Sequence, residues 1–248
     1  MVKRALDVLL SSVALIVFLP LLIPVAIILR LTGDGYIFYR QQRVGKDGRI
    51  FGLYKFATMI ENSPNLPGGL LTAKHDPRVL PVGRILRATK VNEIPQLLNV
   101  LRGDMSLIGP RPQTVLHFEV FPEHVKREII RVRPGLSGIG SVVFRNEDSV
   151  LAHCGKDAAG FYAEDIAPYK GELETWYVRN QRGLLDLLLI LLTVWVVLFP
   201  QSRWHFTFLD GLPQPKSQVL ADLLGMKAAD KEIVLDVRPG SVARSAVP

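Results

Sequence analysis

The stretch VLLSSVALIVFLPLLIPVAIIL, Val8 to Leu29, decides the fold, because it carries no charge over a length that suits a membrane. Pro20 and Pro24 fall in its second half, and proline kinks or breaks a helix. Each half of about 11 residues rises only about 17 Å, roughly half of a hydrocarbon core. The stretch predicts a re-entrant helix-break-helix, and a proline-kinked spanning helix is the alternative.

Basic residues flank this stretch on both sides. Lys3 and Arg4 precede it, and Arg30 and Arg40 are among the cations that follow. The positive-inside rule assigns both flanks to the cytoplasm, which favours re-entry over spanning. Residues 1–33 are therefore predicted to be a membrane helix that contacts phospholipid, and the net charge of +7 suits an anionic surface or phosphate ligands.

A second apolar segment, GLLDLLLILLTVWVVLF, runs from Gly183 to Phe199. It is shorter than a comfortable span, so an interfacial helix, a short spanning helix and a buried core helix all remain open. Residues 34–200 are predicted to form a cytosolic catalytic domain with interfacial helices. Residues 201–248, which carry proline and glycine breaks, are expected to be a C-terminal appendage.

The middle of the chain mixes strand and helix signals. Residues 35–59 alternate apolar and polar side chains around a Lys46-Asp47-Gly48 turn, which predicts a β-hairpin. Residues 82–89 indicate a short basic helix, and Pro95 suits the first turn of the next one. The fold class is therefore a mainly helical α+β domain. The single cysteine excludes an intrachain disulfide and a cysteine-rich zinc site.

The densest functional stretch is TKVNEIPQLLNVLRGDMSLIGPRP, Thr89 to Pro112. Asn92 and Glu93 are expected at a helix N-terminus, where the partial positive charge favours anions. Arg111 lies between two prolines, and a guanidinium so placed suits bidentate binding of phosphate. The simpler alternatives are that Asn92 is a helix cap and that Arg111 forms a surface ion pair.

Several blocks occur in an order that resembles one protein family over residues 3–200. The blocks are KRALD, FYRQQRVGKDGRIFGLYKFATM, DPRVLPVGRILRATKVNEIPQLLNVLRGDMSLIGPRP, VRPGLSG and WYVRN. The chain resembles the bacterial sugar transferases, the monotopic phosphoglycosyl transferases. The resemblance implies a place on the cytosolic face of the bacterial inner membrane, a UDP-sugar donor and Mg²⁺. It also implies transfer of sugar-1-phosphate to polyprenyl phosphate in glycoconjugate or exopolysaccharide synthesis, with no nucleic acid as partner.

The resemblance also assigns roles to single residues. Glu93 matches the glutamate that helps to bind Mg²⁺, and Asn92 occupies the position of the nucleophilic aspartate. Arg111 matches the arginine of the GPRP block, and Lys55 matches the lysine of the family's KFRTM block. Two departures from the pattern are Ala57 and Leu19, where the family usually has arginine and serine. The remaining expectations are phosphate contacts from Arg87 and Arg133 and a second metal ligand from Asp104.

Asn92 leaves the reaction open, because a carboxamide is neutral and its oxygen is a poor nucleophile. In one interpretation the chain still transfers sugar-1-phosphate, through another carboxylate or by direct attack of polyprenyl phosphate. In a second, it is a glycosyltransferase that moves the sugar onto a polyprenyl-diphosphate-linked sugar and releases UDP. In a third, it is an inactive membrane scaffold.

Overall fold

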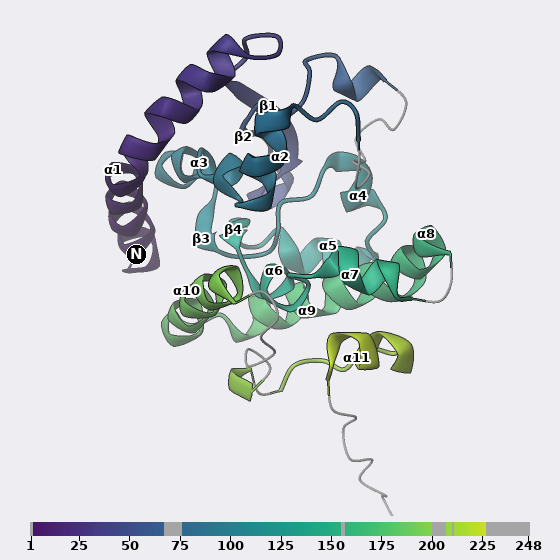
Figure 1. The fold of residues 1–248 in the computed structure, drawn as a ribbon. Helices are drawn as coiled ribbons and strands as arrows, with labels where there is room; N and C mark the ends of the chain where they lie inside the picture. The colour runs from purple at the N-terminus through teal and green to yellow at the C-terminus, as the bar shows by residue number, and fades with distance from the viewer. Residues whose placement is uncertain (1, 67–75, 155–156, 200–206, 210, 227–248) are drawn as a thin grey trace, which may run out of the picture.

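The computed structural model of this chain describes residues 2–66, 76–154, 157–199, 207–209 and 211–226 (Figure 1). It is a mainly helical α+β fold with two small sheets, one antiparallel and one parallel. The helices and strands are α1 (Val2–Leu31), β1 (Phe38–Val44), β2 (Ile50–Phe56), α2 (Pro81–Ala88), α3 (Gln96–Arg102), β3 (Ser106–Ile108), α4 (Val115–Glu119), α5 (Glu123–Ile129), β4 (Gly135–Ser137), α6 (Ile139–Val143), α7 (Glu147–Ala152), α8 (Ala158–Phe161), α9 (Ala167–Asn180), α10 (Gly183–Leu198) and α11 (Gln218–Leu224).

The long apolar helix α1 is continuous, which corrects the predicted break. α1 runs from Val2 to Leu31 with Pro20 and Pro24 inside it, and Figure 1 shows it bent along its length. Each proline removes one backbone donor and displaces the carbonyl four residues earlier. A bend meets this steric demand and leaves the other backbone hydrogen bonds of the helix intact.

The N-terminal end of α1 is tied to the globular body by polar contacts. The Lys3 ammonium lies 2.7 Å from a carboxylate oxygen of Asp186 in α10. Arg4 donates to carbonyls at the end of α3. Asp7 is buried, and its carboxylate accepts a hydrogen bond from the Leu107 amide at 3.1 Å. The predicted membrane-flanking cations Lys3 and Arg4 therefore anchor the helix to the protein itself.

The C-terminal end of α1 returns to the same body. Val25 and Leu29 are buried and pack with Phe56 of β2 and Leu86 of α2. Much of the side of α1 that faces away from the body is apolar and exposed. α1 is the one described helix that is long and apolar enough to cross a membrane.

The hairpin and the basic helix form as predicted. β1 and β2 pair antiparallel, with Phe38 opposite Phe56 and Val44 opposite Ile50, and the chain turns at Lys46–Gly48. α2 begins and ends within one residue of the predicted range. Asn99 fastens α3 beneath the hairpin, because its side-chain amide bonds backbone groups of β2.

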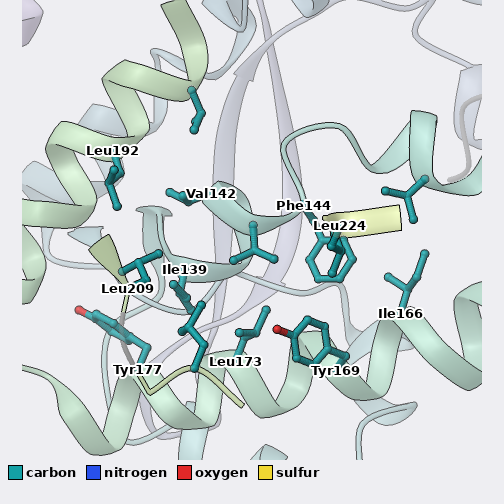
Figure 2. Packing of buried hydrophobic residues seen from close by; sticks show 14 of the residues in the cluster. Ile139, Val142, Phe144, Ile166, Tyr169, Leu173, Tyr177, Leu192, Leu209 and Leu224 are labelled. Atoms are coloured by element: carbon teal, nitrogen blue, oxygen red, sulfur yellow. The ribbon is translucent and has the colours of Figure 1, made fainter. Parts of the chain in front are cut away.

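The main hydrophobic core lies between α6, α9 and α10 (Figure 2). One face of α10 enters this core, whereas its opposite face leaves leucines such as Leu184 and Leu191 exposed. The described part of the predicted C-terminal appendage also packs here. The side chains that it contributes to the core are Leu209, Leu212, Leu220 and Leu224.

Candidate active site

The Asn-Glu pair lies in a tight turn between α2 and α3. Residues Val91–Glu93 form one 3-10 turn, entered through Lys90 in the left-handed region with φ 62°. The simpler alternative, that Asn92 caps a helix, is not found, because its side chain makes no cap hydrogen bond and α3 begins three residues after Glu93. The turn places the side chain of Glu93 beside the hairpin instead.

Glu93 is the centre of a cluster of cations. Its Oε1 lies 3.5 Å from the Lys55 ammonium and 3.4 Å from the Arg111 guanidinium. Burial by itself raises the pKa of Glu93, but the positive charges of Arg111, Lys55 and Lys90 outweigh it and lower the pKa from 4.5 to about 2. Glu93 is therefore an anion at every physiological pH.

The cations around Glu93 are themselves crowded. Burial lowers the pKa of Lys55 to about 8, and the charge of Glu93 opposes this shift. Burial likewise lowers the pKa of Arg43 to about 10, with a further contribution from Arg111. Several positive charges thus share one anionic partner, which leaves the site with an excess of positive charge for an anionic ligand.

Arg43 is a site residue that the sequence prediction missed. It donates to the Pro112 carbonyl at 3.0 Å, and its buried Nε has no partner in the described part of the chain. A signal was available in the predicted hairpin. Successive side chains of a strand point to opposite faces, and residues that pair across a hairpin share a face. Lys55 pairs with Tyr39, and Arg43 lies four residues after Tyr39 on β1, so Lys55 and Arg43 lie on the same face of the hairpin.

The other predicted site residues divide into two groups. Burial lowers the pKa of Arg87, and the negative charge of Glu93 opposes this shift. Arg87 therefore lies close to Glu93. Asp104 instead accepts a hydrogen bond from Asn99 at 3.1 Å, and Arg133 donates to the Gly103 carbonyl at 2.7 Å. Both lie at the C-terminal end of α3, which is about 10 Å long and begins just after Glu93. Neither residue makes a described contact with Glu93, Lys55 or Arg111.

Asn92 presents an unused oxygen. The residue is 8% exposed, and its Oδ1 makes no hydrogen bond with any described residue. A buried carbonyl oxygen without a partner is costly unless a ligand or water satisfies it. Position 92 thus holds a neutral hydrogen-bond acceptor.

A buried carboxyl group supports the Arg111 loop from the other side. Glu174 of α9 accepts a hydrogen bond from the Arg111 amide at 3.3 Å, and its Oε2 has no partner among the described residues. Burial raises the pKa of Glu174 to about 7, against the opposing effects of that hydrogen bond and of Lys170. Gly140 leaves room for the carboxyl group, because a Cβ there would lie 2.6 Å from Oε1.

The raised pKa of Glu174 predicts a pH-dependent stability. The folded state keeps the proton up to about pH 7, whereas the unfolded state releases it near 4.5, so the free energy of unfolding falls as the pH rises through this window. Glu174→Gln is expected to exceed wild type by about 2–3 kcal/mol at pH 8 and to match it near pH 4. Thermal unfolding in detergent at several pH values measures this, and a difference that does not change with pH would contradict it.

Comparison with known proteins gives one family match. The family model described as bacterial sugar transferase matches residues 1–200. A UDP-N-acetylgalactosamine-undecaprenyl-phosphate N-acetylgalactosaminephosphotransferase of Aeromonas hydrophila is 34% identical over 200 residues, covering 79% of this chain and 44% of that protein. The exopolysaccharide production protein ExoY of Sinorhizobium fredii is 33% identical over 206 residues, covering 77% of this chain and 83% of that protein.

A third relative shows the same partial overlap. A UDP-glucose:undecaprenyl-phosphate glucose-1-phosphate transferase of Klebsiella pneumoniae is 34% identical over 197 residues, which cover 77% of this chain and 39% of that protein. The chain therefore spans less than half of two of these relatives and most of the third. The residues after 200, including α11, lie outside the matched family model.

Proposed function

We propose, from the premise that this chain belongs to the bacterial sugar transferase family, that it transfers sugar-1-phosphate from a UDP-sugar to undecaprenyl phosphate in exopolysaccharide production. The observation that carries this proposal is the cluster of Lys55, Arg43 and Arg111 around Glu93. Such a cluster of cations suits a diphosphate, because a diphosphate carries more negative charge than the single carboxylate of Glu93 supplies.

Because Asn92 cannot attack phosphorus, the transfer proceeds without a covalent enzyme intermediate. A phosphate oxygen of the lipid acceptor attacks the β-phosphorus of the donor, and the bond from that phosphorus to the bridging oxygen of UMP breaks. Arg111 and Lys55 stabilise the charge that grows on the departing UMP and on the transferred phosphoryl group. The products are UMP and a polyprenyl-diphosphate-linked sugar.

The residues present fit a magnesium ion bound together with the donor. Mg²⁺ is usually held by one or two protein oxygens and by substrate phosphates. Glu93 offers a carboxylate, and the Oδ1 of Asn92, which bonds no described residue, offers a second hard oxygen beside it. When bound, Mg²⁺ would neutralise charge on the phosphate oxygens. Asp104 is left out of this set, because its carboxylate accepts a hydrogen bond from Asn99 and makes no described contact with Glu93.

A second candidate function is favoured by Asn92 alone. If the acceptor attacks the anomeric carbon, UDP leaves as the intact diphosphate and no enzyme nucleophile is required. The same cations would stabilise the departing UDP, and the acceptor would be a polyprenyl-diphosphate-linked sugar.

The nucleotide released distinguishes these functions. Purified protein in detergent, supplied with Mg²⁺, UDP-glucose or UDP-N-acetylgalactosamine, is expected to release UMP when undecaprenyl phosphate is present. Chromatography of the nucleotides measures the result. Release of UDP with a diphosphate-linked acceptor would establish the second candidate instead, and no turnover with a broad donor panel would favour the scaffold.

Asn92→Asp is expected to create the covalent step that wild type lacks. The new carboxylate would attack the β-phosphorus, release UMP and keep the sugar-phosphate as an acyl phosphate. Intact-protein mass spectrometry with donor and without acceptor is expected to show this adduct in Asn92→Asp, but not in wild type or in Asn92→Ala. An adduct on wild type would mean that another residue is the nucleophile.

The way α1 is attached supports a re-entrant place on the cytosolic face of the bacterial inner membrane. Both ends of a helix about 45 Å long contact the same globular body, through Lys3 at one end and Leu29 at the other. The exposed apolar face of α10 would then lie at the interface. Single cysteines at Val2 and Lys46, in a Cys154→Ser background, are expected to react with an impermeant maleimide from the cytosolic side alone; labelling from opposite sides would refute re-entry.

A further inference from the structure

A second polar cluster lies beside the Arg111 loop and has no part in the mechanism above. The Lys170 ammonium of α9 lies 2.6 Å from a carboxylate oxygen of Glu147 at the start of α7. The same ammonium lies 5.0 Å from the ring centroid of Phe144 and 5.4 Å from that of Tyr162. An ion pair and two aromatic rings thus converge on one nitrogen.

The fold places this cluster next to the diphosphate site. Lys170 and Glu174 are four residues apart on α9, so their side chains share one face of the helix, one turn apart. Glu174 holds the Arg111 amide, and Arg111 in turn reaches Glu93. Burial lowers the pKa of Lys170 and raises that of the Tyr162 phenol, and the nearby positive charge of Arg111 acts to lower both.

Two features suit a binding role better than a purely structural one. The side chains of Lys170 and Glu147 are 19% and 28% exposed, so neither is sealed inside the core. Tyr162 begins a π-helical turn, Tyr162–Ile166, directly before α9. Such turns often occur at functional sites, where they change the direction of a side chain.

We propose that Glu147, Tyr162 and Lys170 form the subsite that binds the sugar of the nucleotide-sugar donor; this inference rests on the proposed function. A carboxylate accepts hydrogen bonds from hydroxyl groups, and an ammonium donates to hydroxyl oxygens. The tyrosine ring offers an apolar surface to the C–H groups of a sugar ring. The pair is neutral as a whole, which suits an uncharged sugar and not a further phosphate, because Glu147 would repel one.

Binding measurements on the full chain test this subsite without requiring turnover. Lys170→Met keeps the apolar stem and removes the charge, and Glu147→Gln removes the opposite charge. Each variant is titrated calorimetrically in detergent with Mg²⁺ against UDP-glucose, UDP-N-acetylgalactosamine and UDP. Affinity for the UDP-sugars is expected to fall about 10- to 100-fold, with a changed ratio between the two sugars, while affinity for UDP changes less than about twofold.

A matched control is Lys126→Met in α5. Lys126 also pairs with a carboxylate, Glu119 at 2.8 Å, and lies 5.9 Å from an aromatic ring centroid, that of Phe118. It is expected to leave the affinities for all three ligands unchanged.

Three outcomes would overturn the assignment. Equal weakening of UDP and UDP-sugar binding would make the cluster a nucleoside or phosphate site. Unchanged UDP-sugar binding together with a lower melting temperature would make the pair a structural link between α7 and α9. Wild type that binds neither UDP nor UDP-sugars would refute the proposed function itself, and the subsite with it.

Discussion

Glu93→Gln is expected to reduce the transfer rate about 100-fold or more, because it removes the proposed magnesium ligand and the only anion that pairs with Lys55 and Arg111 at this site among the described residues. Glutamine keeps the shape of the side chain, so the turn at Val91–Glu93 is retained. Initial rates of UMP release from a saturating UDP-sugar measure the effect.

The loss must be separated from misfolding. Glu123→Gln removes an exposed carboxylate that lies 2.9 Å from Lys126, and it is expected to leave the rate unchanged. Glu93→Gln should keep the circular dichroism spectrum of wild type. A variant that folds and retains most of the wild-type rate would remove Glu93 from the proposed site.

Arg111→Ala is expected to reduce the transfer rate about 100- to 1000-fold, since its guanidinium is an exposed cation that pairs with Glu93 and is the donor best shaped for phosphate. Its side chain is 46% exposed, whereas that of Lys55 is 18% exposed, so Arg111 is more open to an incoming diphosphate than Lys55 is. Rates are compared at several donor concentrations, because the loss should appear in both kcat and KM.

The lysine variant tests geometry against charge. Arg111→Lys keeps the positive charge but loses the planar pair of donors, and it is expected to stay about 10-fold or more below wild type. Arg131→Ala is the control, because Arg131 is a 68% exposed arginine that pairs with Glu128 at 3.1 Å. Equal activity of Arg111→Lys and wild type would show that charge alone is required.

Helix α1 shows what a local sequence pattern can and cannot predict. The absence of charge over Val8 to Leu29 predicts a membrane segment, and the structure has an apolar helix there. The prolines were expected to break this helix, yet a bend accommodates them. The attachment of Lys3 to Asp186 was also hidden from sequence, because the two residues are 183 positions apart.

The candidate site likewise combines residues that the sequence identifies with residues that only the fold reveals. Glu93, Lys55 and Arg111 are identified in the sequence by motif and resemblance, and the fold brings them together. Arg43 and Glu174 carry no motif of their own. Arg43 is placed by the register of a hairpin, and Glu174 by the packing of α9 against the Arg111 loop.

The sequence by itself determined the long apolar segment, the hairpin, the family and the neutral side chain at position 92. Each of these is set by residue type or by short-range periodicity, and both can be read directly from the order of residues in the chain. The tertiary structure alone decided which charges surround Glu93, that Asp104 bonds Asn99, and that Lys170 pairs with Glu147. These features depend on contacts between segments that are distant in the sequence. The distances between the charged groups, and the burial of those groups, set their pKa values, so no single stretch of the chain predicts them.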